Sequence, residues 1–365
     1  MSLTPLVGHV AHRDRIAGAV AEGRLPQVLL ITGPAGVGRQ RLALWTGQLL
    51  LCTSRGTTGP CGACRACRLV LQLAHPDLHW FVPIPRPKAG EPDKQVDEAA
   101  EALAEVMTAR RGKPVWGTPD GMSIHGVASA RLLQRRASLT PVEGRTKVFI
   151  IGDAERLVPQ ESSQEAANAL LKLLEEPPAD TVILLTATDA RRVLPTIRSR
   201  AVVLRLEPLA EADVRTAVRQ HLDPVPADAQ LDALVRRADG CVGRALTEER
   251  SDAGAAAAAQ VLADALDRSA APRARRALAQ GTFAARGEFS EMLDALALLL
   301  GDAARAGAGV APARALPAAA RALDATRALQ ALEHVEAARA MAQGNVNPQL
   351  ILAALGDDLQ EALCR

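Results

Sequence analysis

The stretch ITGPAGVGRQ, from Ile31 to Gln40, decides how the rest of the sequence is interpreted. It follows the phosphate-loop pattern G-x-x-x-x-G-K-[ST], with Gly33, Gly36 and Gly38 where the backbone must turn tightly around an anion. An apolar run, Pro26 to Thr32, precedes it with the character of a buried strand, and helical apolar spacing follows from Arg39 to Leu51. The order strand, glycine loop, helix therefore predicts a P-loop core.

Two side chains of the motif are replaced. Arg39 stands where lysine reaches the phosphates, and Gln40 stands where a hydroxyl holds Mg²⁺. Arginine keeps the charge but not the compact ammonium, and glutamine offers magnesium no hydroxyl. Gly33, Gly36, Gly38 and Arg39 are therefore expected to form a degenerate cofactor-binding loop, in which binding of ATP is doubtful. The alternative is a glycine-rich turn with no relation to nucleotides.

A second strand supports this interpretation. KVFIIGD, Lys147 to Asp153, is an apolar run that ends in an acid, as the Walker B strand does when it delivers a carboxylate towards Mg²⁺. The next position, where a glutamate would activate water, is Ala154. The pattern therefore indicates a P-loop fold whose nucleotide chemistry is weakened or lost.

Four of the six cysteines lie in one short stretch: Cys52, Cys61, Cys64 and Cys67. Four thiolates with two C-x-x-C steps suit a closed tetrahedral structural zinc site, which leaves no position for a catalytic water. Disulfides are the rival interpretation, but they are rare in intracellular proteins. His75 and His79 follow at helical spacing and are interpreted as non-ligands, since four thiolates complete the set.

Composition limits the function classes. The 365 residues carry a formal net charge of +2, with three Trp, four Phe and no Tyr. A zinc-dependent module for single-stranded DNA is disfavoured, because such modules use basic grooves and aromatic stacking platforms. No apolar stretch is long enough to span a membrane, and the first residues do not resemble a signal peptide. A cytoplasmic location without membrane contact is expected.

The pattern of segments predicts three domains. Residues 1–207 alternate strands and helices, which implies a parallel sheet. This domain carries the zinc module at 52–67 and an apparent insertion near 85–120, expected to be a mobile loop or insertion with one helix rather than core. Residues 208–251 form a small helical lid, and alanine- and leucine-rich residues 252–365 form an all-helical domain.

A basic helix leaves direct DNA contact open. SARLLQRRASL places Arg131, Arg135 and Arg136 on one helix, with the first two separated by one turn. A solvated basic face is the favoured interpretation. Contact with phosphates inside an assembly is the alternative.

Several motifs in one order resemble the delta-prime subunits of bacterial replicative clamp loaders, within the AAA+ superfamily. The P-loop approach GRLPQVLLITGPAGVGR, the four cysteines after the P-loop helix and AANALLKLLEEPP (Ala166 to Pro178) carry the resemblance. LPTIRSR resembles the family's Ser-Arg-Cys motif, with Ser199, Arg200 and Ala201 at its three positions. GNVNPQLIL, Gly344 to Leu352, resembles the end of the collar domain.

The resemblance implies an AAA+ domain, a lid and an oligomerising collar. It implies a non-hydrolysing stator subunit of the DNA polymerase III clamp loader, in a hetero-pentamer with motor subunits and a delta subunit. That complex loads the sliding clamp onto primed DNA, and Arg200 would act as an arginine finger on a neighbour's ATP. Thr188 matches a polar sensor position, whereas Gly243 replaces the lid arginine and Arg244 follows it. The alternative is an ATP-hydrolysing motor subunit with an atypical P-loop.

Overall fold

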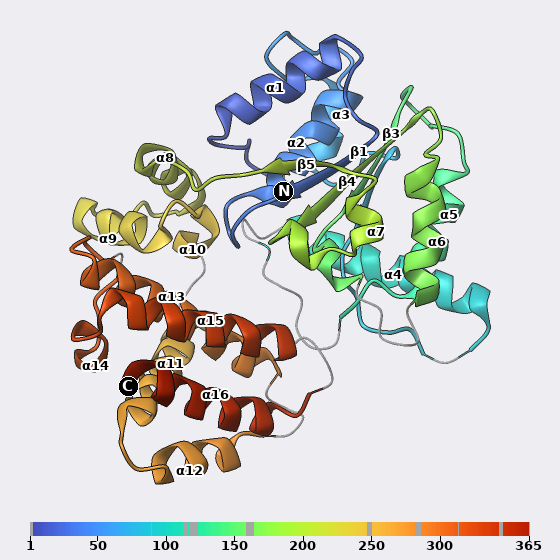
Figure 1. The fold of residues 1–365 in the computed structure, drawn as a ribbon. Coiled ribbons are helices and arrows are strands. Elements are labelled where there is room, and N and C mark those ends of the chain that lie inside the picture. The colour runs from blue at the N-terminus through green and yellow to red at the C-terminus, as the bar shows by residue number, and fades with distance from the viewer. Residues whose placement is uncertain are drawn as a thin grey trace. The chain divides into compact units, whose positions relative to one another are not determined.

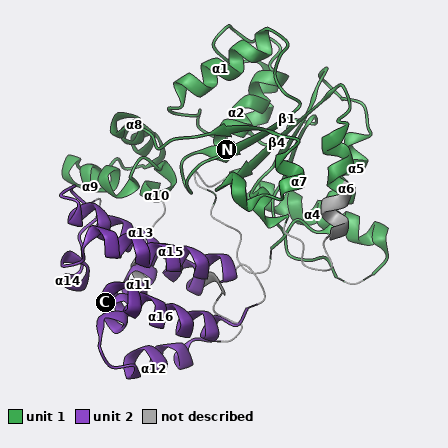
Figure 2. Ribbon diagram, in the orientation of Figure 1, with its two compact units in different colours: residues 1–246 green, residues 247–365 purple. Residues whose placement is uncertain are grey.

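The computed structural model describes residues 3–88, 90–111, 116, 123–157, 164–246, 250–281, 286–312, 314–342 and 346–364. The chain divides into two compact units, residues 1–246 and residues 247–365 (Figure 2). Each unit has its own hydrophobic core. The division at 246/247 falls within the lid-to-collar region that the sequence indicates, and the finer three-domain division stays a prediction.

A five-stranded parallel sheet forms the centre of unit 1, in the order β2-β3-β4-β1-β5. Every residue of the three middle strands is buried, which explains their near-continuous apolar sequences. The parallel sheet predicted from alternating strands and helices is confirmed. The strands are β1 (Val28–Thr32), β2 (Leu78–Phe81), β3 (Lys147–Ile151), β4 (Thr181–Ala187) and β5 (Val202–Arg205).

Helices cover both faces of this sheet, as parallel strands require (Figure 1). On one side lie α1 (Val10–Ala21), α2 (Arg39–Leu51) and α3 (Arg65–Leu71). On the other lie α5 (Val127–Ala137) and α6 (Gln164–Glu175). Short turns of helix follow β3 and β4 and precede β5: η1 (Ala154–Arg156), η2 (Ala190–Arg192) and α7 (Pro195–Arg198).

The segment near 85–120 contradicts one expectation. Its helix, α4 (Pro92–Arg111), buries Val96, Ala99 and Leu103 in the same core as the sheet. These residues recur at helical spacing, so one face of α4 is apolar and packs inward. The helix is therefore part of the core, and the description as a loop outside it was wrong for Pro92–Arg111.

A small helical module completes unit 1. It comprises α8 (Glu211–His221), α9 (Asp228–Ala238) and α10 (Val242–Leu246), which share a separate apolar cluster. The module meets the end of the sheet where Leu209 N donates to Gly240 O at 2.9 Å. The predicted helical character of this region is confirmed.

Unit 2 is all-helical in its described residues, as predicted. Its core is built from leucine and alanine side chains, and α13 packs against α11 and α15. Among the described residues, no helix is both long and apolar enough to cross a membrane. The helices are α11 (Arg250–Leu266), α12 (Ala271–Ala279), α13 (Arg286–Gly307), α14 (Ala318–Arg321), α15 (Ala325–Ala342) and α16 (Pro348–Cys364).

Candidate functional site

The glycine loop joins β1 to α2 as the sequence predicts. Gly33 has φ 148°, and a Cβ there would lie 2.7 Å from the carbonyl oxygen of Leu206, so only glycine fits. Gly38 is the N-cap of α2, with φ 108°. The backbone cradle of a phosphate loop is therefore present at the N-terminus of a helix.

Arg39 does not point out of this cradle. Its side chain is 9% exposed, its Nη1 donates to the carbonyl of Gly33, and its Nη2 lies 3.9 Å from Asp153 Oδ1. Burial lowers the pKa of Arg39, and the nearby carboxylates of Glu155 and Asp153 act against that shift. The Arg39 guanidinium, which replaces the lysine, therefore contacts the carbonyl of Gly33 and the Asp153 carboxylate instead of extending into the phosphate loop.

Gln40 occupies the position of the magnesium ligand and is bonded on both sides. Its Nε2 donates to Asp153 Oδ2 at 3.3 Å, and its Oε1 accepts from Arg110 Nη1 at 2.7 Å. Arg110 comes from the last turn of α4, with its guanidinium 5.1 Å from the ring centroids of Trp80 and of Trp116. Burial lowers the pKa of Arg110 to about 10. The side chains of Asp153, Gln40 and Arg110 therefore form a hydrogen-bonded network beside the loop.

The acid after β3, Asp153, is mostly shielded from solvent, with 15% of its side chain exposed. Burial, together with the like charge of Glu155, raises the pKa of Asp153, while Arg39 and Arg110 act in the opposite direction. Gly152, directly after the strand, also faces the loop helix, because a Cβ there would lie 3.0 Å from Gln40 Nε2. Gly152 and Asp153 therefore both face Gln40, and Gly152 has no side chain there.

The helical module closes over the loop. Gly243 N donates to Gly36 O at 2.9 Å, and a Cβ on Gly243 would lie 2.6 Å from Gly36 Cα. Two glycines allow this backbone approach, so position 243 serves packing on the loop. On the other side, the buried ring of His9 bonds the carbonyl of Val37 through Nε2 at 2.8 Å, and burial lowers the pKa of His9.

Thr188, the candidate sensor, is also bonded within the chain. Both its backbone N and its Oγ1 donate to Glu155 Oε1, at 2.9 and 2.7 Å. Sequence reasoning missed Glu155, Gly152 and Arg110 as members of this network. The first two follow a strand that was recognised, whereas Arg110 comes from a distant helix and leaves no local signal.

Arg200 lies away from this network, between α7 and the edge strand β5. Its guanidinium bonds Glu175 through Nη2 and the carbonyl of Thr196 through Nη1, the latter at 2.7 Å. The side chain is 32% exposed. The structure therefore places Arg200 in a surface ion pair, with part of the side chain open to solvent.

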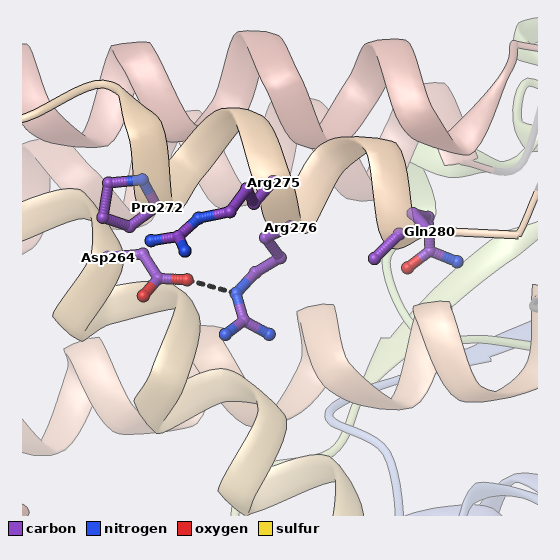
Figure 3. Close-up of a pocket in the computed structure, with 6 residues that line it drawn as sticks. Asp264, Pro272, Arg275, Arg276 and Gln280 are labelled. Carbon is purple, nitrogen blue, oxygen red and sulfur yellow. Dashed lines mark hydrogen bonds and ion pairs between the residues drawn. The ribbon is translucent and has the colours of Figure 1, made fainter.

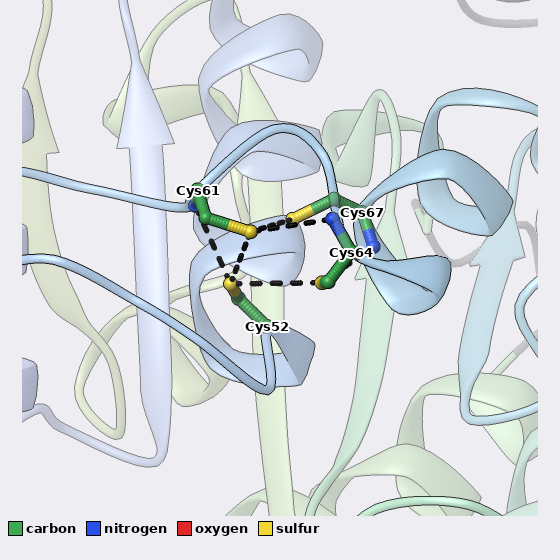
Figure 4. Close-up of side chains that lie close together, drawn as sticks. All are labelled: Cys52, Cys61, Cys64 and Cys67. Atoms are coloured by element: carbon green, nitrogen blue, oxygen red, sulfur yellow. Dashed lines mark hydrogen bonds between the residues drawn. The ribbon is translucent and has the colours of Figure 1, made fainter.

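The four cysteines of the predicted metal site converge (Figure 4). All their sulfur atoms lie within 4.8 Å of one another. Sγ of Cys52 lies 3.5 Å from that of Cys61 and 3.9 Å from that of Cys64, and Cys61 and Cys67 are 3.9 Å apart. A tetrahedron of zinc–sulfur bonds of about 2.3 Å has edges of about 3.8 Å, so the spacing fits a zinc ion.

The same distances exclude disulfides, whose sulfur atoms are about 2.05 Å apart. Backbone N–H groups point at the sulfurs: Cys61 N at Cys52, Cys64 N at Cys61, and Cys67 N at Cys64, at 3.3 to 3.4 Å. Such bonds favour thiolates, the form that binds a metal. His75 accepts from Asp77 N at 3.1 Å through Nδ1, and His79 contacts Phe149, so neither belongs to this cluster.

The basic helix α5 has three different arginine environments. Arg131 is exposed, Arg135 pairs with Asp97 at 3.2 Å, and Arg136 lies over the ring of Phe81. Burial lowers the pKa of Arg136. The three side chains therefore do not form one continuous basic face.

Unit 2 has a hollow of about 400 Å³ at its surface (Figure 3). Arg276, which faces this hollow, pairs with Asp264. The Arg275 Nε donates to the carbonyl of Ala271 in its own helix. These arginines are engaged within the unit, and no site is assigned there. The hollow is lined by Asp264, Pro272, Arg275, Arg276, Ala279 and Gln280.

Comparison with known proteins identifies one family. A family model described as DNA polymerase III, delta subunit, matches residues 9–210, more than half of the chain. DNA polymerase III subunit delta' of Pseudomonas aeruginosa is 35% identical over 47% of this chain and 40% of its own length. DNA polymerase III subunit delta' of Bacillus subtilis is 28% identical over 67% of this chain and 60% of its own length.

A relative of another name matches nearly as much of the chain. DNA polymerase III subunit tau of Salmonella typhimurium is 28% identical over 66% of this chain and 32% of its own length. The matches to these three relatives thus cover 32% to 60% of the relatives' lengths.

The cysteine cluster predicts one zinc ion per chain. Cys64→Ser should lose most of the metal and lower the melting temperature, because the loop around the cluster is held by the metal rather than by apolar packing. Elemental analysis and thermal unfolding provide the measurements. Cys364→Ser, at an exposed cysteine outside the cluster, is the control and should keep both. Purified chain without zinc, or a Cys64→Ser chain with full metal content, would contradict the assignment.

The buried acid predicts a pH-dependent stability difference. Because the folded state raises the pKa of Asp153, its contribution is largest below the unfolded pKa of about 3.9 and is lost as pH rises through the folded pKa. The parent should therefore lose stability relative to Asp153→Asn as pH rises from about 3.9, the unfolded pKa, towards neutrality, as measured by urea unfolding.

Asp189→Asn is the matched control with the opposite sign. A hydrogen bond from Arg191 lowers the pKa of Asp189, so its contribution is present above the unfolded pKa and is lost as pH falls. The parent should gain stability relative to this variant as pH rises. The same pH trend for both variants would show that the Asp153 environment is described wrongly.

Proposed function

The chain belongs to the DNA polymerase III delta subunit family, and we propose that it is a non-hydrolysing stator subunit of the clamp loader. The observation that carries this proposal is the network of Arg39, Gln40 and Asp153. In it, the groups that would hold phosphate and magnesium bond one another instead. The proposal places the chain with the relatives named delta' rather than with those named tau.

Hydrolysis of ATP at a P-loop requires three things of the protein. A lysine neutralises the phosphates, a hydroxyl and an acid hold Mg²⁺, and a polar group positions the attacking water. Here Arg39 is buried against Gly33, Gln40 has no hydroxyl, and Ala154 stands where a glutamate would activate the water. Removal of such charge stabilisation and water activation lowers rates by orders of magnitude at each step. The joint loss supports a catalytically degenerate subunit that is not itself an enzyme.

The fold also disfavours nucleotide binding. The backbone of the helical module meets Gly36, and the ring of His9 bonds the carbonyl of Val37. A nucleotide would have to displace the module and break the Arg39 contacts before its phosphates reached the loop N–H groups. The cradle then acts as the structural joint between sheet and module, in a domain of AAA+ type.

The second candidate is an ATP-hydrolysing motor subunit with an atypical P-loop. The similarity to the tau subunit of Salmonella typhimurium favours it. The closed network and the replacements at Arg39, Gln40 and Ala154 count against it, because the lysine, the hydroxyl and the water-activating acid are missing and only the Asp153 carboxylate remains. Nucleotide turnover by the isolated chain discriminates the two.

The role proposed for Arg200 is a finger acting on a neighbour's ATP. Guanidinium is planar, always charged and forks onto phosphate oxygens. Arg200 stands beside the edge strand β5, where the exposed Val202 and Val203 also leave room for another subunit. The proposed partners are motor subunits and a delta subunit in a hetero-pentamer, with the sliding clamp and primed DNA reached through the complex. Zinc would be structural.

Replacement of Arg200 tests the stator role. In the reconstituted complex, Arg200→Ala should assemble normally but reduce DNA-stimulated ATP hydrolysis and clamp loading. Such fingers contribute about 10³ to 10⁵ in rate at the site they serve. Arg200→Lys should restore little, because lysine has no fork.

Arg191→Ala is the matched control for this experiment. Arg191 is 85% exposed, follows the C-terminal end of β4 at the opposite end of the sheet from Arg200, and pairs with Asp189 at 2.7 Å, so its loss removes another surface ion pair. It should leave ATP hydrolysis unchanged. An Arg200→Ala complex that hydrolyses ATP and loads clamps like the parent complex would refute the finger role.

A further inference from the structure

Glu175 ends helix α6, and its position is set by the sequence that follows. Pro177 and Pro178 stop the helix, so Glu175 is its last residue. A carboxylate at a helix C-terminus meets the negative end of the helix dipole and its unpaired carbonyls, which is unfavourable. The Arg200 guanidinium, bonded to Glu175, offsets that repulsion. The ion pair therefore has a local electrostatic reason.

The contacts of Arg200 within its own chain use the same guanidinium N–H groups that a phosphate would use. Nη2 bonds Glu175, and Nη1 donates to Thr196 O at 2.7 Å and to Ser199 Oγ at 3.2 Å. A phosphate held in the bidentate manner takes two parallel N–H groups of the guanidinium. Arg200 cannot present both terminal nitrogens to a phosphate while it keeps all of these partners.

The pair is also weak enough to be exchanged. The side chains of Arg200 and Glu175 are 32% and 47% exposed, and ion pairs of this kind contribute little because water screens them. A triphosphate carries several negative charges on oxygens arranged for the fork, so it outcompetes a single carboxylate. The need to release Glu175 would therefore weaken the binding of Arg200 to the triphosphate by only a modest factor.

We propose that Glu175 is a positioning residue that holds Arg200 within its own chain and must be displaced before Arg200 reaches a phosphate of a neighbouring subunit. The inference rests on the finger role proposed above for Arg200. It makes engagement of the finger a competition between Glu175 and the neighbour's nucleotide. The pair thus sets a threshold for hydrolysis at the subunit boundary.

The experiment measures kcat/KM for ATP in the reconstituted complex. Glu175→Gln keeps the shape of the side chain and removes its charge, so kcat/KM should rise about two- to fivefold, the range expected for release of an exposed ion pair. Glu176→Gln is the matched control. It removes the adjacent charge at the same helix end, and that side chain makes no ion pair in the described part of the chain. It should leave kcat/KM unchanged.

The double variant Glu175→Gln/Arg200→Ala separates the possible failures. If Glu175 acts through Arg200, the double variant should equal Arg200→Ala alone, with no gain. Equal kcat/KM for parent and Glu175→Gln, or a gain that persists without Arg200, would overturn the inference. If Arg200→Ala itself has no effect, the finger role fails instead, and the two outcomes are distinguished in the same set of complexes.

Discussion

The contact between Arg39 and the acid after β3 determines how unit 1 can be used. A P-loop keeps an opening between its helix and the neighbouring strand for phosphate and metal. Here Asp153 meets Arg39 and Gln40 across that opening, and Arg110 of α4 bonds Gln40 from the other side. Each buried charge has an opposite charge near it, which buried charges require. The arrangement supplies internally the charge balance that Mg–ATP would otherwise bring.

Other features follow from this constraint. The helical module rests directly on Gly36, and His9 bonds the carbonyl of Val37, as the proposed loss of phosphate binding would allow. With zinc bound as proposed, the cysteine cluster would also hold the chain just after α2. Arg200 is different: its partners are exposed groups of its own chain, which another charged group can replace. A rigid interior with an exchangeable surface arginine agrees with the proposed stator role.

Much of this could be predicted from the sequence, because the decisive signals are local. The glycine loop between Thr32 and Arg39, the apolar strands and the cysteine spacing each depend on neighbouring residues, and the structure confirms these elements. The bond from Arg110 to Gln40 joins residues 70 positions apart, and the partners of the apolar face of α4 lie outside the helix, so neighbouring residues alone do not reveal these contacts. The pairing of Glu175 with Arg200 joins residues 25 positions apart and is not visible in a local pattern either. The side-chain orientations of Arg39 and Arg200 are set by partners elsewhere in the fold, so the motifs in which they occur do not predict them.

Titration of the isolated chain with Mg–ATP by calorimetry tests the central claim most directly. The account predicts no saturable binding below the millimolar range, with or without Mg²⁺, because Arg39 bonds the loop carbonyl of Gly33 beside Asp153 and the helical module contacts the loop at Gly36. A positive control is a P-loop ATPase titrated under the same conditions. Saturable, magnesium-dependent binding in the micromolar range, about −8 kcal/mol, would contradict it. That result would mean that the loop opens to nucleotide and that the replaced side chains still serve it.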